Sequence, residues 1–277
     1  MSTEKSRATT TRRAVLAVGG VALLAGFWPD RHPAQPGDIQ LDVAHPAPPA
    51  PPAHPAPPAR RTEPARRTVP ARTAHRRRRR TEPDEIMYYV HDGRKGIALT
   101  IDDGPSPEYT PQVLRLLEKY KVTATFSMIG LEVAAYPGLV RDVAAAGHKI
   151  ANHTWAHLDL PALAPVAVAD QINRATAAIH QVTGREPDLF RAPYGAWSPD
   201  VLEQCASAGL TPLDWSVDPR DWSRPGVNSI VANIMRNTRT GSIILEHDGG
   251  GNRAQTVAAL KIVIPRLLDA GYHFGTP

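Results

Sequence analysis

The chain has 277 residues, of which 42% are hydrophobic, and this is enough for one or two domains with packed cores. Its net charge of +5 is unevenly distributed, because residues 1–85 carry a net charge of +7 and the other 192 residues carry −2. The single cysteine, Cys205, excludes an intrachain disulfide and a thiolate metal cluster. It stands in a run with helical character, where a buried and inert thiol is expected.

The first segment, residues 1–35, is predicted to direct export. Arg12 and Arg13 precede an apolar run over residues 14–28, which is shorter than the roughly 20 residues that span a bilayer. Adjacent arginines before a weakly hydrophobic run that contains glycine are typical of a twin-arginine export signal. The alternative is an uncleaved N-terminal membrane anchor. We therefore expect the protein to be secreted or tethered at the cell surface.

The next segment, residues 36–85, is rich in proline, alanine and arginine and is predicted to be a disordered linker. Half of the 28 prolines lie in the first 85 residues, and large apolar side chains are almost absent from this stretch. An extended, solvated spacer of the polyproline II type is expected. For the five arginines 76–80 we expect electrostatic contact with an anionic cell wall or membrane surface, and no nucleic acid as partner.

Residues 86–277 alternate between short β-rich runs and longer runs with helical patterning. The predicted strands are 97–101, 122–128, 148–152, 188–191, 210–215, 242–246 and 271–275. The predicted helices are 108–120, 131–146, 165–183, 198–208, 227–239 and 254–270. This alternation predicts a single parallel α/β domain. Seven strands are enough for a barrel, and the pattern also allows an open, doubly wound sheet.

Polar residues cluster just past the ends of these predicted strands. The carboxyl ends of parallel strands share one rim, where active sites of α/β proteins are built. Five segments bring acids, histidines and an arginine to that rim: Asp102 and Asp103; His153 and His157; Arg191; Asp214, Asp218 and Asp221; and His247 and Asp248. This coincidence predicts an enzyme.

The pair His153 and His157 predicts a metal site when it is combined with the acidic pair. A spacing of four residues puts both imidazoles on one side in helical and in extended geometry. Two imidazoles and one carboxylate oxygen suit a catalytic zinc with an open position. One of Asp102 and Asp103 would then be a ligand and the other a free base, since neighbouring strand residues point to opposite faces. The plainer reading is a solvated Asp-Asp-Gly-Pro turn.

His247 is a candidate general acid whose ring an aspartate would hold and whose pKa that aspartate would raise. Asp221 is the first choice for this partner and Asp218 the second. Arg191 could pair with the free base and keep it ionised. Trp155, Trp197, Trp215 and Trp222 also fall within the rim segments, and their aromatic faces favour a carbohydrate site, although each by itself fits ordinary core packing.

The motifs "TIDDGP", "HTWAH", "RAPYG", "DPRDW" and "LEH", in this order, resemble the polysaccharide deacetylases, that is, carbohydrate esterase family 4 with its NodB homology domain. The resemblance covers residues 86–277. It implies a distorted (β/α) barrel of about seven parallel strands and one divalent metal ion, usually Zn²⁺. Two departures are small: Ile101 replaces a usual Phe, and Glu246 stands where many members have an apolar residue.

The resemblance also implies a role for each site residue. Asp103, His153 and His157 would bind the metal. Asp102 would be the catalytic base, oriented by Arg191, and His247 the acid, tuned by Asp221. The backbone N–H of Tyr194 would help bind the oxyanion. Trp222 and Leu245 would form the pocket for the acetyl methyl group, and Trp155 and Trp197 are expected to contact the glycan.

The expected activity is metal-dependent hydrolysis of acetyl groups on a polysaccharide. N-acetylglucosamine units of peptidoglycan or chitin-type glycans are the first choice of substrate. An O-acetyl esterase acting on xylan is the alternative within the enzyme class, because the same residues serve esters and amides. A non-catalytic module that binds cell-wall glycans, and a basic binder of cell wall or nucleic acid acting through residues 60–80, are the alternatives from other classes. A monomer is expected.

Overall fold

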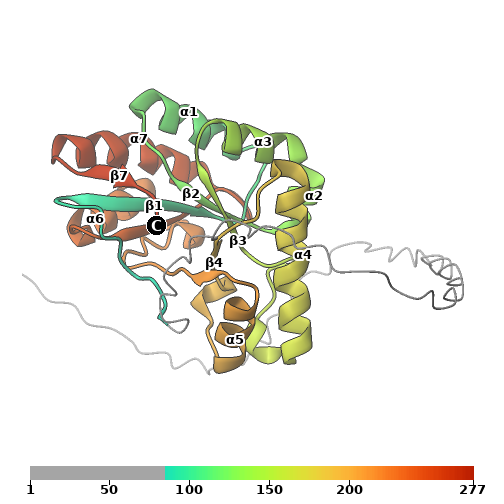
Figure 1. Cartoon of the computed structure of the whole chain (residues 1–277). Coiled ribbons are helices and arrows are strands. Elements are labelled where there is room, and N and C mark those ends of the chain that lie inside the picture. The colour runs from blue at the N-terminus through green and yellow to red at the C-terminus, as the bar shows by residue number, and fades with distance from the viewer. Residues whose placement is uncertain (1–84) are drawn as a thin grey trace, which may run out of the picture. The chain divides into compact units, whose positions relative to one another are not determined.

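The computed structural model describes residues 85–277 (Figure 1). The predicted export signal, the linker up to residue 84 and the arginine run 76–80 lie outside the described residues. Among the helices that the structure describes, none combines the length and the apolar character needed to cross a membrane.

Seven strands form one sheet in which every pairing is parallel. They are β1 (Gly96–Asp102), β2 (Thr125–Met128), β3 (Lys149–Asn152), β4 (Leu189–Phe190), β5 (Thr211–Pro212), β6 (Ile243–His247) and β7 (His273–Gly275). The strand order is β5-β4-β3-β2-β1-β6, and β7 pairs with the beginning of β1. The sequence prediction of a parallel α/β domain with seven strands is therefore confirmed.

The sheet curls into a distorted barrel. The chain that leaves β5 reaches β6, where Val217 forms a parallel bridge with Ile244 and its carbonyl accepts a hydrogen bond from the Leu245 N–H at 2.9 Å. Single bridges at this seam, in place of a full ladder, explain the distortion. Because the two ends of the strand order meet, the structure decides for the barrel and against the open sheet.

The described residues form seven α-helices, which lie around the strands (Figure 1). They are α1 (Thr110–Tyr120), α2 (Gly130–Ala135), α3 (Pro137–Ala145), α4 (Pro165–Thr183), α5 (Pro199–Ser207), α6 (Val227–Asn237) and α7 (Ala254–Asp269). Three short 3₁₀ turns, η1 (Leu160–Ala162), η2 (Pro193–Gly195) and η3 (Asp221–Ser223), lie in the loops. These counts refer to residues 85–277.

The prediction of one helix over residues 131–146 was wrong, because α2 and α3 are separate. Tyr136 lies between them with φ −128° and ψ 55°, outside the helical region. Pro137 follows directly, and the proline ring disfavours helical geometry in the residue before it. Pro137 then begins α3, where its missing N–H costs no hydrogen bond.

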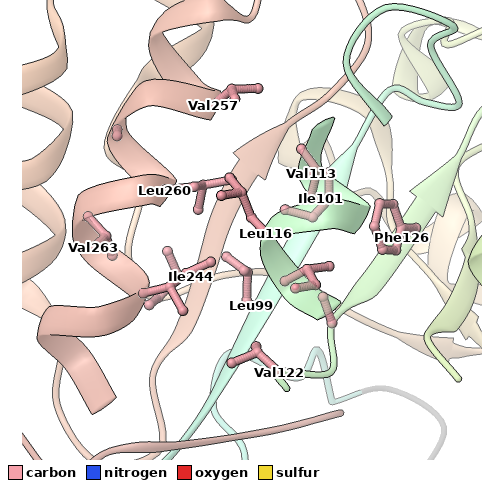
Figure 2. Close-up of a cluster of buried hydrophobic side chains, with 14 of the residues drawn as sticks. Leu99, Ile101, Val113, Leu116, Val122, Phe126, Ile244, Val257, Leu260 and Val263 are labelled. Atoms are coloured by element: carbon pink, nitrogen blue, oxygen red, sulfur yellow. The ribbon is translucent and has the colours of Figure 1, made fainter. Parts of the chain in front are cut away.

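The largest hydrophobic core lies between the sheet and helices that include α1, α3, α6 and α7. Figure 2 shows Leu99 and Ile101 of β1 among Leu116 of α1 and Leu260 of α7, and all four side chains are buried. Each such burial stabilises the fold by about 1.5–3 kcal/mol. Since side chains alternate along a strand, packing residues 99 and 101 against the helices directs Asp102 into the barrel.

Candidate active site

Asp102 and Arg191 form a buried ion pair at the mouth of the barrel. Asp102 ends β1 and is 2% exposed, and Arg191 follows β4 and is fully buried. The Arg191 Nη1 donates to Asp102 Oδ1 at 2.7 Å and to Thr100 Oγ1 at 2.8 Å, and its Nη2 donates to the Asp214 carbonyl at 2.9 Å. The Arg191 guanidinium therefore holds the Asp102 carboxylate in one orientation, and the two charges compensate each other.

Asp103 points to the same side as Asp102, which corrects the expectation from strand alternation. The strand ends at Asp102, and Asp103 adopts a left-handed backbone with φ +71°. This turn brings Asp103 Oδ1 to 3.4 Å from His153 Nε2 and to 3.2 Å from His157 Nε2. Asp102 Oδ2 lies 3.9 Å from His153 Nε2. The rule of alternating faces does not apply here because Asp103 is already outside the strand.

Asp103, His153 and His157 form a possible site for a divalent metal ion. One ligand atom from each residue lies within 4.8 Å of the other two. Asp103 Oδ1 is buried and receives no hydrogen bond, so this oxygen needs a cation or a proton. His153 Nδ1 contacts the Arg191 carbonyl at 2.9 Å, which leaves its Nε2 free as a ligand. The residues that are present therefore fit the group that the sequence predicted.

The pKa shifts of Asp103 and His157 favour the forms that bind metal ions, whereas the pKa of His153 is raised, because the charges of Asp102 and Asp103 outweigh its burial. Burial alone would raise the pKa of Asp103, but the His153 imidazole, 3.4 Å from its Oδ1, outweighs burial and holds the pKa below its usual range. Burial, followed by the charge of His153, lowers the pKa of His157. A carboxylate and a neutral imidazole are the forms that bind metal ions.

His247 and Asp221 form a second buried pair at the same rim. Asp221 Oδ1 is 2.7 Å from His247 Nδ1, and its Oδ2 accepts hydrogen bonds from the His247 N–H at 3.0 Å and from Thr256 Oγ1 at 2.7 Å. Burial opposes a charge on His247, but Asp221 outweighs burial and raises the pKa of the imidazole. Asp218 hydrogen-bonds only to the Arg220 N–H. Of the two aspartates that the sequence offered as partners of His247, Asp221 is therefore the one that contacts it.

Comparison with known proteins decides the family. Residues 90–213 match the polysaccharide deacetylases. A chitooligosaccharide deacetylase of Bradyrhizobium sp. (strain ANU 289) is 44% identical over 193 residues, which cover 65% of this chain and 88% of that protein. This chain belongs to the polysaccharide deacetylase family. The resemblance inferred from the five motifs is thus confirmed.

Other relatives agree with this family membership. A peptidoglycan-N-acetylglucosamine deacetylase of Bacillus cereus (strain ATCC 14579) is 44% identical over 193 residues, which cover 69% of this chain and 90% of that protein. The crystal structure of a peptidoglycan N-acetylglucosamine deacetylase superimposes with a TM-score of 0.66 at 32% identity, covering 68% of this chain and 89% of that one. The distorted barrel is thus the fold of this deacetylase family.

The deacetylase motif "RAPYG" forms the tight turn η2 beside the metal-site residues. Tyr194 has φ +63°, and its ring packs edge-on against His157 with 4.7 Å between ring centroids. The next residue is Gly195, at φ +61°, where a Cβ atom would lie 2.8 Å from the Trp215 ring. The turn therefore needs glycine at this position, and it fixes Tyr194 against one of the histidines.

The four side chains predicted to contact substrate lie in different surroundings. Leu245 is buried and Trp222 is 46% exposed, directly after Asp221. Trp155 carries the Arg174 guanidinium over its ring at 4.3 Å. Trp197 packs on Phe190 and donates its Nε1–H to Asp214 Oδ2 at 2.9 Å. Packing thus accounts for Trp155 and Trp197, and their contact with glycan stays a prediction.

Sequence reasoning missed the loop of three glycines at 249–251 and its anchor, Arg253. Arg253 is buried and donates to the carbonyls of Gly249 at 2.6 Å, Gly250 at 2.9 Å and Trp222 at 3.3 Å. A Cβ on Gly249 would lie 1.9 Å from the Asp103 carbonyl oxygen. The signal was visible as "HDGGGNR", because consecutive glycines after a candidate acid indicate close backbone approach.

Asp248 was placed on the rim by the sequence, and the structure buries its side chain completely. Its Oδ2 accepts a hydrogen bond from Thr110 Oγ1 at 2.5 Å, and its Oδ1 receives none. Burial raises the pKa of Asp248 to about 7. Cys205 is also buried, as predicted, and burial raises the pKa of its thiol to about 12, so the thiol is inert.

Proposed function

We propose that this protein is a metal-dependent deacetylase that hydrolyses N-acetyl groups of N-acetylglucosamine units in peptidoglycan or chitin-type glycans. The observation that carries the proposal is that three groups of side chains with different chemical properties lie at one rim of the barrel. These are a possible metal triad, an aspartate held by a buried arginine, and a histidine held by a buried aspartate. The names of the relatives support the choice of an acetylated amino sugar.

Asp103, His153 and His157 would hold the metal ion, and we propose Zn²⁺. Two imidazole nitrogens and one carboxylate oxygen match the ligand types of catalytic zinc sites that keep an open position. The chemistry that a bound ion supplies is polarisation of the acetyl carbonyl and activation of water. The Arg191 carbonyl orients His153 through its Nδ1, and the Arg191 guanidinium orients Asp102. One residue thus positions both a metal ligand and the proposed base.

Asp102 would act as the general base. Arg191 occupies Oδ1 of this carboxylate, and Oδ2 faces His153, on the side of the metal triad. From this position Asp102 accepts a proton from the attacking water molecule, while the oxygen of that water adds to the acetyl carbon. The Tyr194 N–H would donate to the oxyanion that forms on the carbonyl oxygen.

His247 would act as the general acid. Asp221 raises its pKa, so the imidazolium form persists at a higher pH than for an ordinary histidine. When the tetrahedral species collapses, the C–N bond breaks and His247 gives its proton to the nitrogen. Acetate and a free amino sugar leave. Trp222 and Leu245 would enclose the acetyl methyl group. Trp222 directly follows Asp221, and Leu245 lies two residues before His247 on β6, so both β6 side chains point to the same face.

The proposal is tested by acetate release from the full-length protein, with added Zn²⁺ and after chelation. N-acetylglucosamine oligomers, peptidoglycan and acetylated xylan are compared at equal acetyl concentration. We expect release that depends on metal and is highest for the N-acetylated glycans. Preference for acetylated xylan would make the protein an O-acetyl esterase. No release from any substrate by protein with Zn²⁺ bound would favour a glycan-binding module.

A further inference from the structure

Glu246 is a buried carboxyl group that the proposed mechanism does not use. It lies on β6 one residue before His247 and is fully buried. No hydrogen-bond donor reaches either of its carboxyl oxygens. A charged carboxylate in this position would be strongly destabilising, because ions without partners are rarely buried in proteins. The Glu246 carboxyl group therefore keeps its proton. A buried O–H group in turn needs a hydrogen-bond acceptor nearby.

The Asp221 carboxylate is the acceptor that lies at hand, because its Oδ2 is 3.0 Å from the backbone nitrogen of His247, the residue next to Glu246, and the two carboxyl groups shift each other's pKa in opposite directions. Asp221 already accepts from the His247 ring, the His247 N–H and Thr256 Oγ1. Two negative charges on neighbouring carboxyl groups would repel each other strongly at the effective dielectric constant of a protein. Asp221 accepts every hydrogen bond that reaches the pair, and these bonds stabilise a negative charge on Asp221. Asp221 is therefore the ionised carboxylate, and Glu246 keeps its proton.

We propose that Glu246 is a neutral positioning residue whose carboxyl O–H donates to Asp221 and holds that carboxylate in line with His247 Nδ1. The inference deepens the proposed function, on which the role of His247 as general acid rests. This additional donor to Asp221 disperses part of its charge. It therefore limits how strongly Asp221 stabilises the imidazolium, and keeps the proton of His247 available for transfer.

The other charged groups nearby agree with a neutral Glu246. Burial and the charge of Asp221 raise the pKa of Glu246 well above its usual range, and Asp218 acts in the same direction. Arg253 opposes them, but its guanidinium is bonded to the carbonyls of Gly249, Gly250 and Trp222. Asp102 and Asp103 act on His247 from the opposite side and raise its pKa.

The test compares Glu246→Gln with Glu246→Leu in the full-length, Zn²⁺-loaded protein, with Asp218→Asn as a matched control. The Gln side chain is neutral and still donates, so we expect kcat/KM within about twofold of the parent and an unmoved alkaline limb of its pH profile. Leu removes the donor. We expect about a tenfold loss of kcat/KM and an alkaline limb about half a pH unit higher, because Asp221 regains its full charge.

Two measurements are independent of turnover. The infrared difference spectrum of parent minus Glu246→Gln should contain the carbonyl band of a protonated carboxylic acid, and the His247 ring should titrate at the same pH in both proteins by NMR. If Glu246 were ionised, the band would be missing and Glu246→Gln would lower the pKa of His247. Either result overturns the inference, even if Glu246→Leu fails to fold. A parent that releases no acetate from any substrate defeats the proposed function and leaves these two measurements to decide the state of Glu246.

Discussion

At the scale of single residues, the site depends on buried charges that are each matched by one partner. Arg191 and Asp102 neutralise each other at 2.7 Å with almost no exposure to water. His247 and Asp221 do the same at 2.7 Å on the other side of the rim. Removing one member of a buried pair costs about 3–5 kcal/mol, since the other charge is left without compensation. Function and stability are therefore coupled in these residues.

Asp102→Asn should abolish most of the activity and leave the metal triad intact. The amide keeps the shape of the side chain but cannot take a proton from water, so we expect kcat to fall by about 10²–10⁴-fold. Acetate release and Zn²⁺ content of the purified variant measure the two effects. Asp218→Asn is the control and should retain parental activity. Near-normal turnover by Asp102→Asn would refute the assignment of the base.

Asp221→Asn should shift the pH dependence of kcat/KM. The general acid acts in its protonated form, so activity declines as pH rises through the pKa of His247. Asp221 raises that pKa, and its replacement by a neutral amide should move the alkaline limb to lower pH. A pH series on a soluble N-acetylglucosamine oligomer measures this limb. A limb that stays in place in Asp221→Asn would show that another group is the acid.

At the scale of elements, short loops after the strands position the chemistry. The glycine loop 249–251 lies directly against the backbone of Asp103, and Arg253 ties this loop to the segment of Trp222. The turn η2 likewise sets Tyr194 against His157. Each of these loops thus positions a site residue that belongs to a different loop.

Gly249→Ala should weaken metal binding as well as the fold. The added Cβ would meet the Asp103 carbonyl oxygen at 1.9 Å, and the backbone has to move to avoid it. We expect Zn²⁺ affinity to fall by about 10–100-fold and the fold to lose about 1–3 kcal/mol. Zn²⁺ titration and thermal unfolding measure these effects.

The matched control is Gly138→Ala in α3, where a Cβ meets nothing within 4 Å. Alanine favours a helix over glycine by about 0.5–1 kcal/mol, so this variant should be slightly stabilised and bind Zn²⁺ as the parent does. Equal affinities of Gly249→Ala and Gly138→Ala would contradict the role given to the glycine loop.

At the scale of the whole molecule, the charge of the chain is divided between a basic N-terminal part and a mildly acidic catalytic part. We propose that the protein is exported and that the basic part holds it near an anionic surface. The five arginines 76–80 are the densest run of this charge. Attraction of this kind depends on ionic strength and needs no folded partner.

Replacing the arginines 76–80 by glutamine in the full-length protein should separate tethering from catalysis. We expect weaker sedimentation with anionic cell walls at low salt, and unchanged turnover of soluble oligomers within about twofold, because the site lies in residues 85–277. The parent at high salt serves as the comparison. Loss of activity on soluble oligomers would show that the basic run contributes to the site itself.

Sequence alone determined which residue types follow which strand, because strand alternation, helical periodicity and strand-end motifs are local properties. From these it predicted the parallel α/β domain, a metal site of His153, His157 and one of two aspartates, and Asp221 as first choice of partner for His247; the family resemblance then singled out Asp103 as the third ligand. Only the tertiary structure decided that the barrel closes at Val217 and Ile244, that Asp103 turns in beside Asp102, and that Glu246 is buried against Asp221. These features arise from contacts between residues far apart in the chain and from a single left-handed backbone angle. No local pattern of residue types encodes either of them.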